Sequence, residues 1–413
     1  MKRLSDSYFQ KSLQWLIYLL TVSMVIFSQF APTVIVLILA VWVFQGQFVR
    51  KLVGIRQHFF FTSLFIVMFV LYLSGLLYTT NFSYGLTDVF LKIPFILFPL
   101  VFSGFGQDLM GEGHRKKVMT IFSCSVILIA LYSLGQSTLM YFEIKDVKVF
   151  YYGFLAGNQH PSYLAMYSVF AIAVLLVNAF ENSSELKILH WVFIIFGVMF
   201  LFVFVILLSS RAGMISLIMT FVVAAVFILT EQRQYAKGSL FLLSFIIFFY
   251  VCYEFFPRSF GRLQHTGEVL AGPVTDNTTE DGTAQRLLIW DASISIIKEN
   301  LLLGVGTGDV KDELMLEYKK RGMDATLKGR KNAHNQYLQT FVTIGIAGFV
   351  SLLLMFLIPG LYAIRSRDLL YFLFLAIVGM NLLFESMFER QAGVVFYTFF
   401  NAYLFFSRRG NDE

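Results

Sequence analysis

The chain has 413 residues, of which 57% are hydrophobic and only 14% are charged, and its formal net charge is +6. This composition excludes an ordinary soluble protein, in which about a quarter of the residues are charged. The positive charge does not indicate a nucleic-acid partner, because the basic residues stand in short clusters between apolar runs. Two cysteines, both in apolar runs, indicate neither a disulfide framework nor a metal-thiolate site.

Apolar runs recur from end to end, each of roughly 17 to 25 residues, which is the length that crosses a bilayer as a helix. They do not alternate apolar and polar residues as membrane strands do. The sequence therefore predicts an all-α polytopic membrane protein with about twelve transmembrane helices. The first run follows Lys11 without a convincing cleavage site, so we interpret it as a helix and not as a signal peptide. The predicted spans are roughly 13–29, 31–47, 59–79, 86–104, 118–142, 161–180, 188–208, 212–230, 239–256, 337–359, 369–388 and 391–407.

Lysine and arginine clusters predict the orientation, because short cytoplasmic loops carry an excess of them. With the N-terminus inside, the short outer loops carry little beyond Lys145 and Lys148, and both termini are cytoplasmic. The clusters that then face the cytoplasm are Lys2, Arg3 and Lys11; Arg50, Lys51 and Arg56; Arg115, Lys116 and Lys117; Lys187; Arg233 and Lys237; Arg365 and Arg367; and Arg408 and Arg409.

A long polar stretch, residues 257–336, then lies outside. Gln264 to Gln285 is rich in Gly, Thr and Asp and is predicted to be irregular, whereas Arg286 to Glu299 and Asp309 to Arg321 are predicted to be short helices with apolar faces. A loop with apolar faces should dock on the membrane helices. We expect one integral membrane domain over residues 1–413, with the loop inside it.

His334 stands at the end of this loop, in Asn332-Ala-His334-Asn335-Gln336-Tyr337, and Gly345 and Gly348 follow in the next apolar run. An imidazole at a membrane surface can act as a general base. The alternative is a loop histidine beside a helix start, since Asn332 and Asn335 are ordinary capping residues. We expect the small residues to let another helix pack closely.

Two arginines are candidates for an anion site. Arg211 lies between two apolar runs, in Ser209-Ser-Arg-Ala-Gly213, where a guanidinium is expensive unless it has a partner. Arg286 opens a predicted helix, where a cation opposes the helix dipole. Both present a donor fork that suits phosphate oxygens. The alternatives are a snorkelling arginine at 211 and a solvated one at 286.

Secondary candidates lie on the predicted outer side. Lys92 falls inside the fourth span, beside Pro94, which should kink the helix, and an intramembrane lysine is functional or paired by default. His160 and Tyr163 open the sixth span, in Asn158-Gln-His-Pro-Ser-Tyr163. The sequence leaves open whether His160 has a structural role at the start of the helix or a functional role beside His334. Glu385, Glu389 and Arg390 flank the last outer turn and could pair with each other or with an arginine. The glycines of 304–308 favour a turn and not a nucleotide site, because no parallel sheet surrounds them.

These residues share a chemical logic. A base with arginines and no carboxylate-rich metal cluster fits transfer from a phosphate-activated donor, in which guanidinium charge stabilises the departing pyrophosphate. Because ATP is not expected outside, the donor should arrive already activated, most simply as a lipid-linked glycan. No metal and no other cofactor is therefore expected.

The chain resembles the bacterial O-antigen ligase and O-antigen polymerase superfamily. The resemblance rests on His334-Asn335 with Gly345 and Gly348, on Ser210-Arg211-Ala-Gly213 and on Arg286-Leu-Leu-Ile-Trp290, with weaker support from 81–99 and 160–162. It implies a metal-independent, inverting glycosyltransferase of the GT-C type, active at the periplasmic face of the bacterial inner membrane. Its donor would be an undecaprenyl-pyrophosphate-linked glycan.

Carried over to these positions, His334 would activate the acceptor, and Arg211 and Arg286 would hold the pyrophosphate. Lys92, His160, Asn335 and Tyr163 are secondary candidates. The resemblance favours O-antigen ligation to lipid A-core in lipopolysaccharide biosynthesis, but a polymerase of glycan repeat units fits almost as well, and some relatives glycosylate protein hydroxyls. A transporter of lipid-linked sugars is the alternative from another class, although the two similar halves common in transporters are not evident.

Overall fold

The computed structural model describes residues 2–104, 110–182, 186–230, 233–272, 274 and 276–409, with the side chains of 2–7 and 408–409 left aside. These residues form helices and connecting turns, and no strand occurs among them. The chain divides into two compact units. Unit 1 comprises Met1–Gln45, Gly111–Gln264 and Ala363–Asn381, and unit 2 comprises Gly46–Met110, His265–Tyr362 and Leu382–Glu413.

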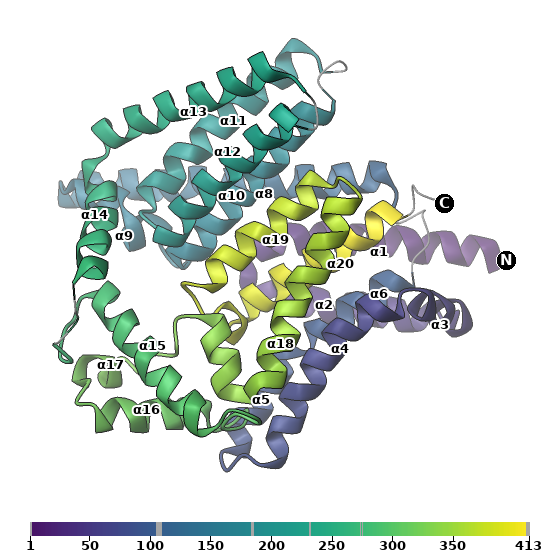
Figure 1. The fold of residues 1–413 in the computed structure, drawn as a ribbon. Helices are drawn as coiled ribbons and strands as arrows, with labels where there is room; N and C mark the ends of the chain where they lie inside the picture. Colours follow the sequence, from purple (N-terminus) through teal and green to yellow (C-terminus); the bar gives the residue numbers. More distant parts are fainter. Residues whose placement is uncertain are drawn as a thin grey trace. The chain divides into compact units, whose positions relative to one another are not determined.

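Unit 1 is built around α10 (Pro161–Glu181), which is buried along almost its whole length. This helix is apolar on every side, as expected for a helix enclosed by others. Each of the helices α10, α11 and α12 packs against the helix that follows it in the chain, so that α13 packs against α12 (Figure 1). A Cβ on Gly213 of α12 would lie 2.6 Å from the Ala165 Cβ of α10, so these small residues set the close approach of the two helices. The helices of unit 1 are α1 (Lys2–Ile26), α2 (Ala31–Phe44), α8 (Glu112–Ile144), α9 (Tyr152–Ala156), α10 (Pro161–Glu181), α11 (Ile188–Leu207), α12 (Arg211–Thr230), α13 (Tyr235–Phe255), the first part of α14 (Pro257–Ala271) and α19 (Leu369–Leu382), with the 3-10 turns η1 (Ser28–Phe30) and η3 (Val147–Phe150).

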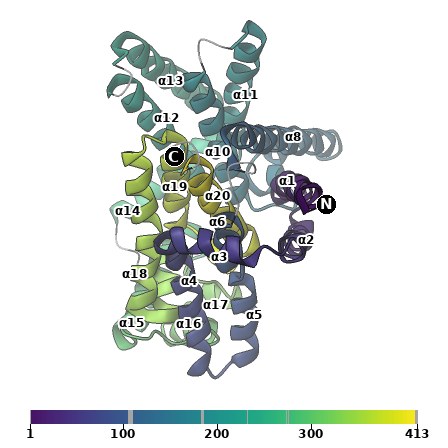
Figure 2. The ribbon, with the colours of Figure 1, turned by 90° about the vertical axis from the view of Figure 1, so that its right-hand side faces the viewer.

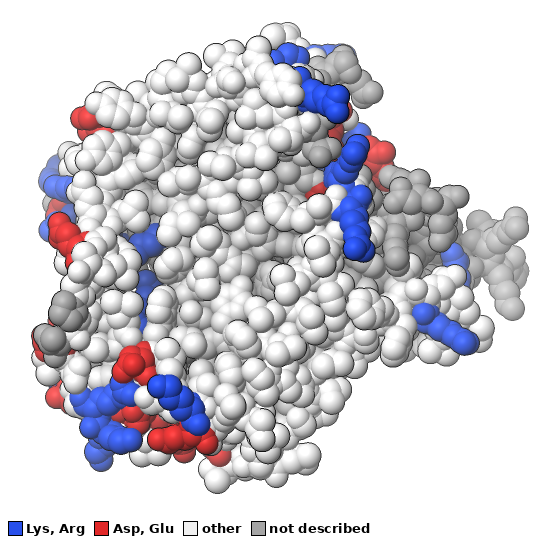
Figure 3. All heavy atoms as spheres, in the orientation of Figure 1, with Lys and Arg blue, Asp and Glu red and all other residues white. Residues whose placement is uncertain are grey.

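Unit 2 holds three helices of the predicted outer loop, α15 (Gly282–Glu299), α16 (Val310–Lys320) and α17 (Asp324–Lys328). Ile289, Leu314 and Tyr318, from α15 and α16, form a core with Val342 of α18, and Figure 2 shows α15 to α17 beside the beginning of α18. Charged side chains gather on the outer surface of α15 to α17 (Figure 3). The helices of unit 2 are α3 (Phe48–Gln57), α4 (Phe59–Ser74), α5 (Phe82–Lys92), α6 (Pro94–Ser103), α15 (Gly282–Glu299), α16 (Val310–Lys320), α17 (Asp324–Lys328), most of α18 (Gln336–Arg365) and α20 (Gln391–Arg409), with η2 (Gly75–Leu77) and η4 (Met387–Glu389).

The prediction of a polytopic helical membrane protein is confirmed in its coarse form. In the described part of the chain, nine helices are long and apolar enough to cross a bilayer, or ten if one bent pair is a single span. Twelve spans, the orientation and the GT-C class stay predictions. The expected kink is confirmed, because α5 ends at Lys92 and α6 begins at Pro94.

Among the boundaries that differ from the predictions are those of the second span, the eleventh span and the polar stretch 264–285. The span expected at 31–47 ends at Phe44, and the chain turns by 112° into α3, with Gly46 and Gln47 in left-handed conformations. The span expected at 369–388 ends at Leu382, where the turn that carries Glu385 begins. The stretch expected to be irregular contains the end of α14, which starts at a proline, a residue that suits the first turn of a helix.

The predictions for the long loop itself are largely confirmed. The two amphipathic helices are present as α15 and α16, and their apolar faces pack against Leu338 and Phe341 of α18. Asp309, at the start of α16, accepts hydrogen bonds from the backbone N–H groups of Thr80 and Asn81, both at 2.7 Å. Although burial works in the opposite direction, these donors hold the pKa of the Asp309 carboxyl below its usual value. The part of the loop that forms α15 and α16 is therefore docked within unit 2.

Gly345 has a different role from the one expected. Its φ of 65° and ψ of −161° break α18, and a Cβ there would lie 2.2 Å from the Leu302 carbonyl oxygen. The neighbouring loop satisfies the backbone groups at the break: Val305 N–H donates to the Val342 carbonyl at 2.8 Å, and Ile346 N–H donates to the Leu301 carbonyl at 3.0 Å. The expectation that another helix packs on Gly345 was wrong, because an irregular segment occupies that space.

Candidate active site

His334 stands in the short connection between α17 and α18 with a backbone conformation that few side chains adopt. Its φ is 47°, and its N–H donates to the Asn332 side-chain oxygen at 3.1 Å. Asn335 caps α18 by accepting from the Leu338 N–H at 3.1 Å. Both asparagines thus act locally, as their residue type suggested, and together they fix the backbone that presents the imidazole.

Glu385 brings His334 and Arg286 together. Arg286 Nη2 donates to Glu385 Oε1 at 2.8 Å, and His334 Nδ1 lies 3.4 Å from Glu385 Oε2. The carboxylate therefore uses one oxygen for each partner. The Glu385 side chain is only 10% exposed, whereas Arg286 and His334 are each 23% exposed. The Arg286 guanidinium and the His334 imidazole are thus accessible at the protein surface, whereas the Glu385 carboxylate that joins them is more deeply buried.

The turn that carries Glu385 is fixed by the start of α18. Asn335 N–H donates to the Ser386 hydroxyl at 3.2 Å, and Phe388 N–H donates to the Gln336 side-chain oxygen at 2.7 Å. These contacts connect residues about fifty positions apart in the chain. Because the same short segment carries His334 and anchors this turn, the distance between the imidazole and the Glu385 carboxylate is set locally.

Lys92 holds the other end of this turn from the interior. It is fully buried, and its ammonium donates to Asp88 at 2.7 Å, to the Phe388 carbonyl at 2.6 Å and to Glu389 at 3.4 Å. Burial, together with the charge of Asp88, raises the pKa of the Glu389 carboxyl, although Lys92 works in the opposite direction. Lys92 is thus paired, as expected of an intramembrane lysine; its predicted contact with substrate stays a prediction.

Arg211 begins α12 in unit 1. Ser210 caps this helix by accepting from the Gly213 N–H at 3.2 Å, and the Ser209 hydroxyl donates to the Ser259 hydroxyl at 3.0 Å. The two serines thus form hydrogen bonds that stabilise the turn before Arg211. Arg211 belongs to unit 1, and Arg286 and His334 belong to unit 2, so the convergence of the arginines stays a prediction.

His160 and Tyr163 belong to the start of α10, also in unit 1. His160 Nδ1 accepts from the Ser162 N–H at 3.3 Å and caps the helix, with Pro161 in the first turn. The rings of His160 and Tyr163 meet edge to face, with their centroids 5.7 Å apart. The described geometry gives both residues a role at the helix start, and a direct substrate contact stays a prediction for each.

The contact of Glu385 with both main candidates is not predicted by the sequence. The sequence predicted that Glu385, Glu389 and Arg390 pair with each other or with an arginine, and Glu385 pairs with Arg286. Its signal in the sequence was an acid beside an apolar run. Among the described residues, no group of three or more His, Cys, Asp or Glu side chains could hold a metal ion.

A part of the chain that contains three of these residues is similar to a known protein family. Residues 196–353 match the family model of the O-antigen ligases. This stretch of the chain is therefore similar to the O-antigen ligases. It contains Arg211, Arg286 and His334, whereas Lys92 and Glu385 lie outside it. The resemblance to the ligase and polymerase superfamily is thereby confirmed, and the match supports glycan transfer of the ligase or polymerase type.

A second comparison gives a relative of unassigned function. A segment of 92 residues is 28% identical to an uncharacterised protein of Haemophilus influenzae. The aligned part is 22% of this chain and 23% of that protein, so the chain matches about a quarter of the relative's length.

Proposed function

We propose that this protein transfers a glycan from undecaprenyl pyrophosphate to an acceptor hydroxyl at the periplasmic face of the bacterial inner membrane, and that the acceptor is lipid A-core. The observation that carries the proposal is the contact of one carboxylate, Glu385, with both His334 and Arg286, two residues of the stretch that matches the O-antigen ligase model. A base and a cation, held side by side and partly exposed, suit an acceptor hydroxyl and a pyrophosphate respectively.

His334 is the proposed general base. It takes the proton from the acceptor hydroxyl while the hydroxyl oxygen forms a bond to the anomeric carbon of the glycan. Glu385, at 3.4 Å from Nδ1, orients the ring and stabilises the imidazolium that forms. The other ring nitrogen, Nε2, then faces the acceptor. The proton leaves later to water.

Arg286, together with Arg211, is proposed to hold the leaving group. The bond from the anomeric carbon to the pyrophosphate oxygen breaks as the new bond forms, and its electron pair goes to undecaprenyl pyrophosphate. Attack from the opposite side inverts the anomeric configuration. The contact with Glu385 uses Nη2 of Arg286, and a guanidinium has further donors that can meet phosphate oxygens. Guanidinium charge takes the place of a metal ion in this proposal.

The proposal is tested by transfer in vitro with the full chain. Purified wild-type protein and the His334→Ala variant are given undecaprenyl-pyrophosphate glycan, with or without lipid A-core, in the presence of EDTA. We expect a product only with lipid A-core, and a loss of about 100-fold or more in the variant, the range typical of a general base. His265→Gln is the matched control, because His265 is an exposed histidine of the same predicted loop.

Other outcomes would lead to different conclusions. Ladders of longer lipid-linked glycan without lipid A-core would make the protein a polymerase. Activity abolished by EDTA and restored by a metal ion would overturn metal-independent transfer. No glycan product from folded wild-type protein with native substrates would favour transport of a lipid-linked sugar.

A further inference from the structure

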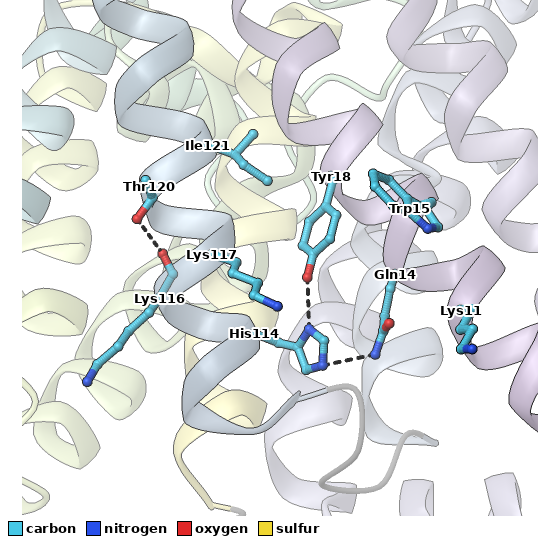
Figure 4. A pocket seen from close by; sticks show the side chains of 9 residues that line it. All are labelled: Lys11, Gln14, Trp15, Tyr18, His114, Lys116, Lys117, Thr120 and Ile121. Atoms are coloured by element: carbon cyan, nitrogen blue, oxygen red, sulfur yellow. Dashed lines mark hydrogen bonds between the residues drawn. The ribbon is translucent and has the colours of Figure 1, made fainter.

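Unit 1 contains a cleft between α1 and α8, with a volume of about 720 Å³ (Figure 4). Its walls include Lys11, Gln14, Trp15 and Tyr18 of α1 together with His114 and Lys117 of α8. Binding sites for small molecules commonly have volumes of about 300–1,000 Å³, so the cleft is large enough for a ligand. Nothing in the proposed transfer reaction uses these residues.

Two hydrogen bonds to His114 join the walls of the cleft. Tyr18 Oη lies 2.8 Å from Nδ1, and Gln14 Nε2 lies 3.0 Å from Nε2 of the same ring. Because the Gln14 amide donates to Nε2, Nδ1 carries the proton and donates to Tyr18. His114 is therefore neutral in this arrangement. Its hydrogen bonds connect α8 to α1. The positive charge of the cleft comes from lysine side chains.

Lys11 and Lys117 provide that charge. Both are exposed, and none of the nine described residues that line the cleft is acidic. Figure 4 shows Lys117 extending toward His114. Lys116 is engaged elsewhere, since its ammonium contacts Glu112 at 2.9 Å and the Asn182 side-chain oxygen at 3.1 Å. The cleft thus presents two cations to an incoming anion.

The cleft also has an apolar side, formed by Trp15 and Ile121. Trp15 is 71% exposed, so its ring is accessible to a ligand in the cleft. The cleft lies at the beginnings of two candidate membrane spans, Tyr8–Ile26 and Glu112–Ile144. Tryptophan and lysine concentrate at this depth, where lipid headgroups meet acyl chains.

We propose that this cleft binds the headgroup phosphate of an anionic phospholipid, with Lys11 and Lys117 on the phosphate and Trp15 against the first part of an acyl chain. The lipid belongs to the leaflet in which α1 and α8 begin, which is the cytoplasmic leaflet in the predicted orientation. Lysines close to an anionic surface contribute about 1 kcal/mol each, so two of them give an affinity difference of about 30-fold.

Native mass spectrometry of the detergent-solubilised full chain tests this site. The protein is titrated with phosphatidylglycerol, with phosphatidylethanolamine of the same acyl chains and with inorganic phosphate. We expect wild-type protein to prefer phosphatidylglycerol, and Lys11→Ala/Lys117→Ala to bind it about 30-fold more weakly. Lys187→Ala/Lys237→Ala is the matched control, because both lysines are exposed in unit 1 and lie outside the cleft. It should keep the wild-type affinity.

Trp15→Ala provides a second test that leaves the charge unchanged. It should weaken binding of both lipids and leave the preference for phosphatidylglycerol in place. Three results would overturn the proposal: equal binding of the two lipids to wild-type protein, the same loss in the control double variant as in the cleft variant, or displacement of phosphatidylglycerol by an equal concentration of inorganic phosphate. The last result would assign the cleft to free phosphate.

Discussion

Arg286 Nη2 lies 2.8 Å from Glu385 Oε1, although 99 residues separate the two side chains in the sequence. The pair is mostly buried, with 23% of the Arg286 side chain and 10% of the Glu385 side chain exposed. The second oxygen of the same carboxylate faces His334. One acid thus sets the position of both groups that we propose to act on the substrate.

We predict that Glu385→Gln lowers the turnover number for glycan transfer by about 10–100-fold, as is typical when a residue that orients a functional group is lost. The amide keeps the shape of the side chain but cannot stabilise an imidazolium. The initial rate at saturating donor is the measurement. Glu268→Gln is the control, because Glu268 is 77% exposed. A lower melting temperature with unchanged turnover would assign Glu385 a purely structural role.

We predict that Arg211→Lys and Arg286→Lys each lose most of the activity. An ammonium keeps the charge but lacks the planar donor fork that meets two phosphate oxygens at once. Arg258→Lys, at an exposed position of α14, should remain fully active. Transfer rates measured at several donor concentrations separate weaker binding from slower chemistry. Full activity of either lysine variant would exclude that arginine as a bidentate pyrophosphate ligand.

Lys92→Met should destabilise the protein by about 3–5 kcal/mol, because it leaves the Asp88 and Glu389 carboxyl groups buried without their cation. The double variant Lys92→Met/Asp88→Asn should recover part of this loss, since it also removes a buried negative charge. Thermal unfolding in detergent is the measurement. If Lys92 binds substrate instead, the single variant should unfold at the wild-type temperature and show a raised KM.

Gly345→Ala should lower the melting temperature markedly. The backbone of Gly345 is in a region that is almost restricted to glycine, and a Cβ would lie 2.2 Å from a carbonyl oxygen. Gly360→Ala in the same helix is the control, because a Cβ there meets nothing within 4 Å. That variant should be neutral or slightly stabilising, since alanine favours a helix. Equal melting temperatures for the two variants would contradict the role of the break.

Much of this organisation could be predicted from the sequence. The length of the apolar runs gave the helical membrane class, because only a helix satisfies its own backbone in lipid. Apolar residues at helical spacing after Arg286 and Asp309 predicted α15 and α16. Proline and asparagine marked the kink at Pro94 and the start of α18, because their preferred conformations act over only a few residues.

Only the tertiary structure decided which distant residues meet. The sequence contained His334, Arg286 and Glu385, but the carboxylate that joins them comes from a turn that the start of α18 and the buried Lys92 hold in place. Gly345 likewise had two possible roles, a helix contact or a helix break, and the backbone of 301–306 determined which. Local preference fixes φ and ψ over a few residues, whereas contacts across dozens of residues depend on how the helices pack.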